Sequence, residues 1–239
     1  MGGLLQGRVA LVTGASGSIG SAVARRFAAE GASVVLAARD IGRMKALYDS
    51  IQGIGGAAML APIDIQDYES VANLALSIGN KFGCLDILVS TAAVLGNLAP
   101  VQECEISKWK EIMGVNLSAN WYIIRHFDAL LKGSSAGRAI FVTSEATKML
   151  LNYSYFAPYA TSKAALEALV QVYASETKHS KLCVNAVYPG PVDSSIYSAI
   201  FPAQEESKLP SPDDITEKFV ELASPECSVT GQVFQLGTP

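Results

Sequence analysis

A tyrosine and a lysine, Tyr159 and Lys163, stand four positions apart in a stretch with helical hydrophobic periodicity. Residues i and i+4 share one face of a helix, so the phenol and the ammonium group are expected to project together. A phenol has an ordinary pKa of about 10, and a neighbouring ammonium lowers it towards neutrality. The pair therefore predicts a proton donor and acceptor for a carbonyl or alcohol oxygen. An exposed Tyr/Lys pair on a surface helix is the plainer alternative.

Two further positions upstream could serve the same reaction. The apolar run 139–142 predicts a strand, and the hydroxyls of Thr143 and Ser144 follow at its end. In a parallel sheet this end lies beside the start of the next helix, so Ser144, with Thr143 as its rival, is expected to donate a hydrogen bond to the substrate oxygen. Asn116 lies in a long apolar helical stretch. The residues alone favour a buried amide satisfied by backbone there over a proton-relay group.

A glycine-rich segment joins the first apolar run to a helix of small residues. Gly14 permits a tight turn, Gly17 lets the backbone approach a pyrophosphate, and Gly20 lets the helix pack closely on the strand. Ser16 and Ser18 add hydroxyl donors, and the helix N-terminus adds partial positive charge. Because a strand precedes the glycines and a helix follows them, the segment predicts dinucleotide binding.

The end of the second apolar run bears on the choice of cofactor. An acidic residue there would bond a ribose 2′-hydroxyl and indicate NAD(H). The sequence has Ala38 and Arg39 instead. The guanidinium of Arg39 suits a 2′-phosphate, and Asp40 is free to cap the next helix. We therefore predict a preference for NADP(H), with NAD(H) as the alternative.

The fold class follows from an alternation of short apolar runs and longer stretches of helical period. The runs are 9–12, 33–37, 57–60, 87–89, 139–142, 182–187 and 232–236, and the helical stretches lie near 19–30, 41–53, 67–82, 106–131, 158–178 and 213–223. This pattern predicts a single α/β domain over 1–239, a Rossmann-type, doubly wound parallel sheet of about seven strands with helices on both faces. The stretch 195–211 breaks the pattern and is expected to form a substrate lid or a surface loop without a role.

Composition excludes several other classes. The chain is 50% hydrophobic and 17% charged with a net charge of −4, which argues against nucleic-acid binding. Its two histidines and four scattered cysteines predict no metal site, and the cysteines are expected to be buried small hydrophobes in a reducing compartment. We found no secretory signal pattern and no apolar run of about 18 residues. A cytoplasmic location without membrane contact is expected.

Together these motifs resemble the short-chain dehydrogenase/reductase superfamily of single-domain type, from about Gln6 to Leu236. The resemblance implies that the catalytic residues are Asn116, Ser144, Tyr159 and Lys163, that Lys163 also holds the nicotinamide ribose, and that Asn116 orders a water. Asp64 and Ile65 resemble the adenine contact, and Pro189 and Gly190 the segment facing the nicotinamide. The remaining cofactor contacts implied are Ile19, Ala92, Val192 and Ser194, with Ser194 where threonine is usual.

Three positions depart from the family pattern. Gly17 and Ser18 stand in reversed order, so the path of the loop is expected to differ. Ser90–Ala93 replaces Asn-Asn-Ala-Gly and loses an amide that would steady the central sheet. About two extra residues separate Ser144 from Tyr159, in a segment rich in Tyr and Phe. These extra residues bear on the lining of the substrate pocket.

The leading prediction is an NADPH-dependent carbonyl reductase. The segments 93–96 and 159–163 look closest to a bacterial branch often labelled 3-oxoacyl-acyl-carrier-protein reductase, so the small-molecule substrate could be an acyl-carrier-bound 3-ketone. The alternatives are an NAD-dependent alcohol or sugar dehydrogenase and, in another class, a non-catalytic dinucleotide sensor or scaffold. Apolar residues on 106–131 and 158–178 predict a homodimer or homotetramer; they are Trp109, Ile112, Trp121, Leu166, Leu169, Val170 and Val172.

Overall fold

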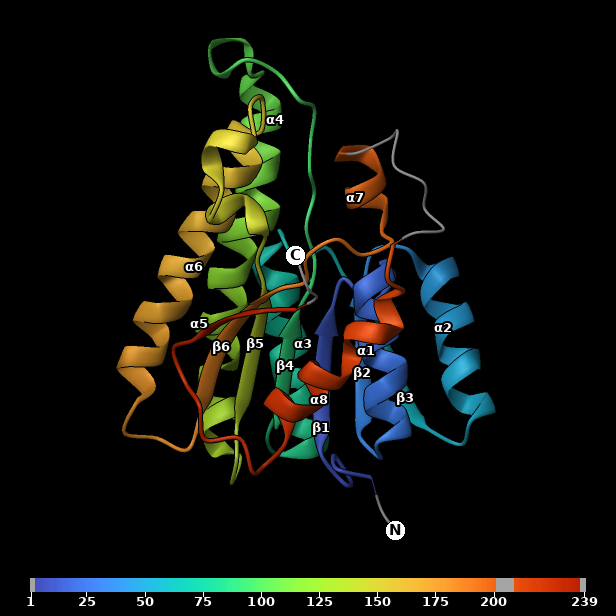
Figure 1. The fold of residues 1–239 in the computed structure, drawn as a ribbon. Coiled ribbons are helices and arrows are strands. Elements are labelled where there is room, and N and C mark those ends of the chain that lie inside the picture. Colours follow the sequence, from blue (N-terminus) through green and yellow to red (C-terminus); the bar gives the residue numbers. More distant parts are fainter. Residues whose placement is uncertain (1–2, 201–208, 237–239) are drawn as a thin grey trace.

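The apolar runs form one parallel sheet in the computed structural model, which describes residues 3–200 and 209–236 (Figure 1). Its strands are β1 Val9–Thr13, β2 Ser33–Ala38, β3 Ala57–Pro62, β4 Ile87–Ser90, β5 Arg138–Val142, β6 Cys183–Tyr188 and β7 Val233–Gln235. Within the described residues their order is β3-β2-β1-β4-β5-β6-β7, and every pairing is parallel. The predicted seven-stranded doubly wound sheet is confirmed.

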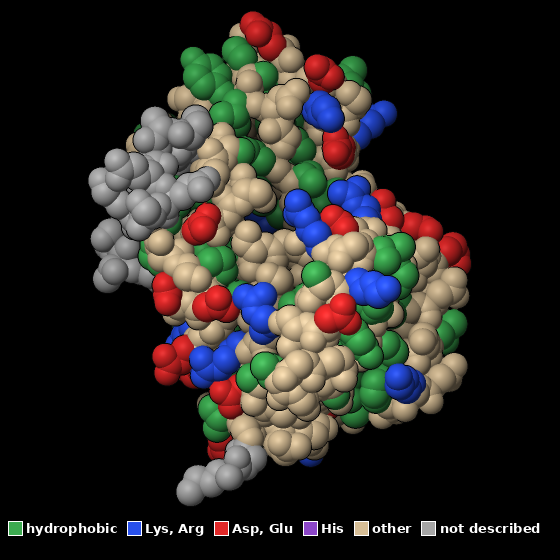
Figure 2. Space-filling view, turned by 90° about the vertical axis from the view of Figure 1, so that its right-hand side faces the viewer, with side chains coloured by type: hydrophobic (Ala, Val, Ile, Leu, Met, Phe, Trp, Pro, Cys, Tyr) green, Lys and Arg blue, Asp and Glu red, His purple; other side chains and the backbone are tan. Residues whose placement is uncertain are grey.

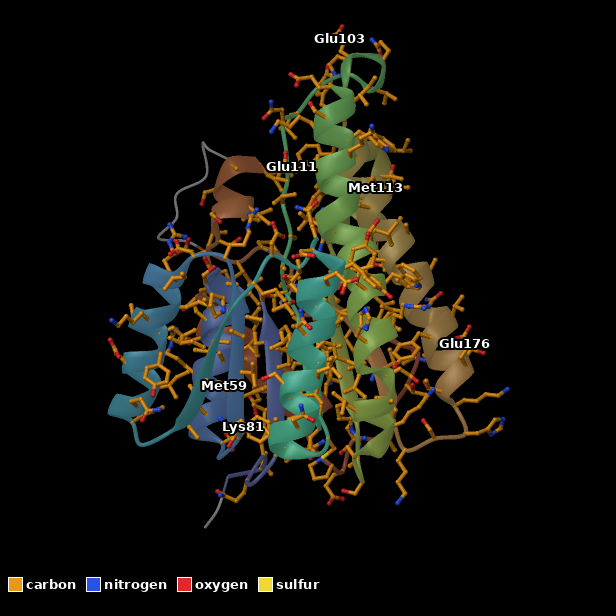
Figure 3. The ribbon with its side chains drawn as sticks, turned by 180° about the vertical axis from the view of Figure 1, so that it is seen from behind. Met59, Lys81, Glu103, Glu111, Met113 and Glu176 are labelled. Carbon is orange, nitrogen blue, oxygen red and sulfur yellow. The ribbon has the colours of Figure 1, made fainter. Side chains whose placement is uncertain are left out.

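Helices cover both faces of this sheet. They are α1 Ser18–Ala29, α2 Ile41–Gly53, α3 Tyr68–Phe82, α4 Ile106–Met113, α5 Ala119–Gly133, α6 Ala157–Thr177, α7 Ser195–Ile200 and α8 Thr216–Ala223. α1, α2 and α8 pack on one face, and α3, α5 and α6 pack on the other (Figures 1 and 3). None of the helices described is long and apolar enough to cross a membrane.

The sheet is apolar because both of its faces are covered. All five residues of β1 are buried, with alternate side chains entering opposite layers of the core. Phe27 of α1 and Phe219 of α8 fill one layer, and Phe127 of α5 fills the other; all three are fully buried. Continuous hydrophobic strands are what a doubly covered parallel sheet requires. The high hydrophobic content of the chain has this origin.

The sheet order places a crevice beside β1. The chain builds outward from β1 to β3 and then returns to the other side of β1 with β4. At such a switch point the loops after the two neighbouring strands diverge, and ligands of open α/β sheets bind outside the carboxyl ends of the strands there. The glycine-rich segment follows β1 and the Ser90–Ala93 segment begins at the end of β4, so both lie at this crevice.

The prediction of one continuous helix over 106–131 is wrong. A π-helical turn, Gly114–Ser118, separates α4 from α5. The side chain of Asn120 donates to the Asn116 carbonyl over 2.8 Å, and a Cβ on Gly114 would lie 2.5 Å from the side-chain oxygen of Gln66. A side-chain amide bonded into the backbone ladder is a recognised cause of such irregularity. The turn brings Asn116 into the interior.

The expected lid segment is described only in part. Its first residues form the short helix α7, and it ends before a 3-10 turn, Pro212–Ile215, that leads into α8. Residues 201–208, which include Phe201 and Pro202, lie outside the described residues. Residues 195–200 of this stretch therefore form a helix, and this helix borders the crevice (Figure 1).

Candidate active site

A cavity of ≈ 520 Å³ occupies the crevice at the carboxyl ends of the strands. From the side of α2 and α7, the surface is hollowed between the upper and lower parts of the molecule (Figure 2). Every predicted cofactor contact lines the cavity, namely Gly14, Ser16, Ser18, Ile19, Gly20, Arg39, Asp64, Ile65, Ala92, Tyr159, Lys163, Pro189, Gly190, Val192 and Ser194. Ser144 lines it too, whereas Asn116 does not.

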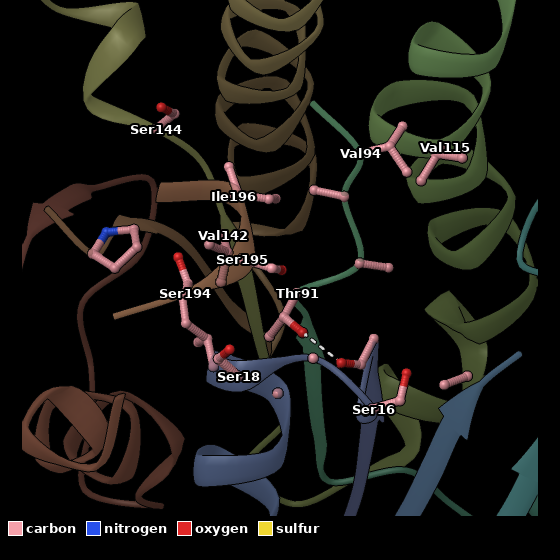
Figure 4. A pocket seen from close by; sticks show the side chains of 18 of the residues that line it. Ser16, Ser18, Thr91, Val94, Val115, Val142, Ser144, Ser194, Ser195 and Ile196 are labelled. Carbon is pink, nitrogen blue, oxygen red and sulfur yellow. Dashed lines mark hydrogen bonds between the residues drawn. The ribbon is translucent and has the colours of Figure 1, made fainter. Parts of the chain in front are cut away.

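The glycine-rich turn keeps a tight path despite the reversed Gly17 and Ser18. Gly14 has φ +70°, and a Cβ there would lie 2.6 Å from the Ala92 backbone nitrogen. A Cβ on Gly20 would lie 2.7 Å from the Thr91 hydroxyl oxygen and closer still to the Gly14 carbonyl. Gly17 is extended, and a Cβ there would meet only the Gly14 carbonyl oxygen, at 3.3 Å. Gly14 and Gly20 therefore define the turn, and Ser18 begins α1 inside the cavity (Figure 4).

Hydroxyl groups replace the amide that the segment after β4 lacks. Ser90 donates to the side-chain oxygen of Asn120 over 2.6 Å, and its hydroxyl lies 3.2 Å from that of Thr13. Thr91 donates to the Thr13 carbonyl over 2.8 Å. β1 is therefore tied to β4 and to α5 at the crevice. The amide is absent from Ser90–Ala93, as the sequence indicates, and the hydroxyls of Ser90 and Thr91 in the same segment tie the central strands together instead.

One arginine follows the end of β2, and a second lies in the first turn of α2. Arg39 lies 4.0 Å from the Asp64 carboxylate with 64% of its side chain exposed. Asp40 accepts a hydrogen bond from the Arg43 backbone over 3.0 Å and caps α2, as predicted. Arg43, one turn into this helix, also lines the cavity. We missed Arg43 from the sequence, although its place in the first turn of the helix after Arg39 was a usable signal.

The first turns of α6 bring the phenol and the amine together. Tyr159 and Lys163 are only 5% and 2% exposed, and the lysine nitrogen lies 6.0 Å from the centre of the tyrosine ring. That nitrogen donates to the Val142 carbonyl at the end of β5 over 2.8 Å. The Ser144 hydroxyl lies close enough to the Tyr159 phenol to lower the pKa of the phenol. The predicted arrangement of hydroxyl, phenol and amine at one end of the cavity is present.

Burial sets the protonation of these groups. It raises the pKa of Tyr159 above its ordinary value, and the hydrogen bond from Ser144 partly offsets the rise. Burial lowers the pKa of Lys163 to about 8. The expectation that the ammonium brings the phenol towards neutrality is wrong for the protein alone, because desolvation of the buried phenolate dominates. At neutral pH Tyr159 therefore holds its proton.

Thr143 and Asn116 are occupied elsewhere. Thr143 is 2% exposed and its hydroxyl donates to the Val187 carbonyl in β6, which leaves Ser144 as the hydroxyl at the phenol. The Asn116 side chain accepts from the Val94 backbone over 2.9 Å and donates to its carbonyl over 3.0 Å. It also donates to Ser162. Asn116 is thus the backbone-satisfied buried amide that the residues favoured, and it fixes the segment that carries Val94 into the cavity wall.

The loop after β6 closes the cavity between the glycine turn and α7. Gly190 has φ +71°, and a Cβ there would lie 2.7 Å from the Leu236 carbonyl oxygen. Val192 is buried beside it. The hydroxyl of Ser194 accepts a hydrogen bond from the Tyr197 backbone over 3.2 Å and so starts α7. Ser194 lines the cavity in this position (Figure 4).

The wall beyond the phenol contains residues that the sequence reasoning did not single out. Glu145, Tyr153, Ile196 and Tyr197 line the cavity near Ser144. The signal for Glu145 was a charged residue directly after the hydroxyl at a strand end. Within residues 3–200 and 209–236, no group of three or more His, Cys, Asp or Glu side chains is arranged to hold a metal ion.

Comparisons with known proteins agree with this geometry. The family model described as short chain dehydrogenase matches residues 8–205. The uncharacterized oxidoreductase YciK of Escherichia coli K12 is 30% identical over 92% of this chain and 87% of its own length. Cis-4-hydroxycyclohexanecarboxylate dehydrogenase of Sinomonas cyclohexanicum is 31% identical over 95% and 94%. A solved structure of a Shigella flexneri 2a protein, described as a short chain dehydrogenase complexed with NADP, superposes with a TM-score of 0.91 at 29% identity, covering 98% of this chain and 99% of that one.

Proposed function

Because this chain belongs to the short chain dehydrogenase family, whose members are oxidoreductases of alcohols and carbonyls, we propose that it is an NADP(H)-dependent carbonyl reductase. The observation that carries the proposal is the buried, protonated phenol of Tyr159 at the wall of the cavity that Ser144 also lines, adjacent to Lys163. A proton donor in this state is what reduction of a carbonyl requires.

The residues around the cavity fit the dinucleotide. Gly14 and Gly20 leave a turn that side chains would fill, at the N-terminus of α1, where a pyrophosphate is stabilised by backbone N–H groups and the helix dipole. Arg39 and Arg43 line the opposite end and would hold a 2′-phosphate. The similar Shigella protein is described as complexed with NADP. These features support NADP(H) over NAD(H).

The chemistry divides between the cofactor and the protein. When bound, NADP(H) supplies the hydride that reaches the carbonyl carbon. The Ser144 hydroxyl donates a hydrogen bond to the carbonyl oxygen, and the Tyr159 phenol gives its proton to that oxygen. The ammonium of Lys163 lies beside the resulting phenolate and stabilises its charge. Lys163 itself is fixed by its bond to the Val142 carbonyl.

Turnover of NADPH with a panel of ketones tests this function. The panel contains cyclohexanones, 3-ketoesters and an acetoacetyl thioester as a mimic of an acyl-carrier-bound 3-ketone, each with NADPH and with NADH. We expect NADPH-dependent reduction of at least one class. If the protein binds NADPH but reduces no carbonyl and oxidises no matching alcohol, the dinucleotide-sensor alternative replaces the enzyme.

Arg39→Ala is expected to lower kcat/KM for NADPH by about 10- to 100-fold and to leave that for NADH nearly unchanged. The reason is the loss of a charge-assisted hydrogen bond worth about 1.5–3 kcal/mol. Steady-state kinetics with both cofactors measure the effect. Arg25→Ala serves as the control, because Arg25 pairs with Asp213 outside the cavity. Equal losses with both cofactors would refute a role at the 2′-phosphate.

Assembly and location complete the proposal. Of the seven apolar residues named for subunit contact, Trp109, Trp121 and Val172 are 38%, 46% and 54% exposed, whereas Ile112, Leu166 and Val170 are buried within the protomer. The exposed three support a homodimer or homotetramer formed through α4, α5 and α6. All four cysteines are free, which supports a reducing compartment such as the cytoplasm. They are only partly buried, so the expectation of buried cysteines is wrong.

A further inference from the structure

The cavity wall contains a carboxylate, that of Glu145, which the proposed proton transfer does not use. Glu145 follows Ser144 directly and opens the 3-10 turn Glu145–Thr147. Its side chain accepts a hydrogen bond from the Tyr153 hydroxyl over 3.3 Å. A carboxylate has about four acceptor positions, and within the described residues the Glu145 side chain accepts this single hydrogen bond. Glu145 therefore keeps acceptor capacity for a ligand in the cavity it lines.

Glu145 and the Tyr153 side chain lie close to the Tyr159 phenol. The pKa of Tyr153 is raised to about 12, first by burial and then by the negative charge of Glu145, with smaller contributions from Tyr197 and Tyr159. Tyr153 packs against the apolar cluster that contains Tyr159, and all four side chains line the same cavity. A substrate whose carbonyl meets Tyr159 will bring its neighbouring substituents near Glu145.

Among the described residues, the basic side chains nearby do not neutralise this carboxylate. Lys148, three positions along the chain, forms its ion pair with Glu167 over 2.7 Å. Arg39 and Arg43 line the cavity at the end of β2, on the cofactor side. Lys163 lies beside Tyr159 and donates to backbone. The charge of Glu145 is consequently available to a ligand.

The connection that carries Glu145 is held in place by α6. Glu167, one turn beyond Lys163, is 8% exposed and accepts from the Thr147 hydroxyl and from Lys148, each over 2.7 Å. The Tyr153 ring packs edge-on against Phe156, with centroids 5.4 Å apart. The Glu145 carboxylate is thus fixed relative to the phenol of Tyr159, since both are anchored to α6.

We propose that Glu145, oriented by Tyr153, determines substrate specificity by selecting a ketone that carries a second hydrogen-bond donor, a hydroxyl or an ammonium group. A carboxylate or phosphate at the same place is rejected by like charge. Val94, Ile196 and Ile200 add apolar surface to the same cavity, which suits a substrate whose remaining part is mainly hydrocarbon. This inference rests on the proposed carbonyl reductase function.

Matched cyclohexanones test the selection. The unsubstituted ketone is compared with its 3- and 4-hydroxy, amino and carboxylate derivatives, using NADPH and the full-length protein. In wild type we expect kcat/KM for the best amino or hydroxy ketone to exceed that for the matching carboxylate by at least about tenfold, the size of one charged hydrogen bond. Glu145→Gln should reduce this ratio by about tenfold. A ratio is used because it cancels any general loss of activity.

Two more variants complete the comparison. Tyr153→Phe removes the donor that orients Glu145 and should lower the ratio in the same direction, which provides a test if Glu145→Gln fails to fold. Glu176→Gln should leave the ratio unchanged, because Glu176 is an exposed carboxylate at the far end of α6 (Figure 3). Turnover of the ketones with the same ratio in wild type and Glu145→Gln overturns the inference and leaves the proposed function intact.

Binding separates the inference from the proposed function. Calorimetry on the NADP⁺ complex compares 4-aminocyclohexanol with 4-hydroxycyclohexanecarboxylate in wild type and Glu145→Gln. Suppose that no ketone is reduced, but that the amine binds more tightly than the carboxylate in wild type and not in Glu145→Gln. The site then selects as inferred, and the reductase function is wrong. If the two ligands bind equally in both proteins, or neither binds, the inference is overturned.

Discussion

Tyr159→Phe is expected to lower kcat for ketone reduction by about 10²- to 10⁴-fold, the usual contribution of a positioned proton donor. The substitution removes one oxygen from a buried ring and leaves its packing in place. Because the other predicted cofactor contacts are untouched, the Kd for NADPH should change much less than kcat. Steady-state kinetics and NADPH fluorescence titration measure the two quantities on the same preparation.

A matched control lies on the same helix. Tyr173→Phe also deletes a hydroxyl, which here donates to Asp128 over 2.8 Å. Tyr173 does not line the cavity. We expect this variant to retain wild-type kcat, with a small loss of stability from the missing bond. Should the two variants lose activity alike, the effect would reflect the structure of α6 and the phenol of Tyr159 would have no chemical role.

Lys163→Met should raise the stability of the protein without cofactor by about 1–2 kcal/mol at pH 7 while it lowers kcat by at least about 10²-fold. Burial lowers the pKa of Lys163 from 10.5 to about 8. The unfolded chain therefore binds the proton more tightly, and the folded state carries a penalty of about 3 kcal/mol below pH 8. Loss of the bond to the Val142 carbonyl, about 1 kcal/mol, offsets part of the gain.

The pH dependence gives this prediction its sign. Between pH 8 and 10.5 the unfolded state is more protonated than the native state, so wild type gains stability from this group as pH rises through that window. The advantage of Lys163→Met should therefore shrink from pH 7 to pH 10. Urea unfolding at several pH values measures it, with the exposed Lys45→Met as a control. A variant that is less stable than wild type at pH 7 would show that the buried charge is not a cost.

The fold could be predicted from the sequence because its physics is local and repetitive. Each strand is a short apolar run, since both faces of the sheet are covered, and each helix has its own period. The pair Tyr159 and Lys163 was found because i,i+4 spacing fixes geometry within one helix. Gly14 and Gly20 could be predicted because a tight turn between a strand and a helix requires glycine. In the structure, their close contacts leave no room for a side chain.

What could not be predicted depends on contacts between distant segments. Ser90 bonds Asn120 and Thr91 bonds the Thr13 carbonyl, across separations of 30 and 78 residues. Glu145 is oriented by a hydrogen bond from Tyr153, and the position of Tyr153 depends on the path of an irregular connection. Spacing along the chain carries no information on such pairings.

The prediction of the pKa shift of Tyr159 was wrong for a related reason. Sequence shows that an ammonium stands one turn away, but it does not show how far the phenol is removed from water. In the folded protein the phenol is 5% exposed, and desolvation raises its pKa despite the neighbouring amine and the bond from Ser144. The direction of a pKa shift therefore requires the burial of the group as well as its neighbours.

Transfer of a label from NADPH tests most directly whether this site reduces carbonyls with Tyr159 as the proton donor. The protein is supplied with NADPH deuterated at the hydride position and with the best ketone of the panel, and the alcohol product is examined by mass spectrometry and NMR. We predict one deuterium on the former carbonyl carbon for each NADPH oxidised, at a rate that Tyr159→Phe lowers by at least about 10²-fold. Oxidation of NADPH without label in the alcohol, or labelling as fast in Tyr159→Phe as in wild type, would contradict the account.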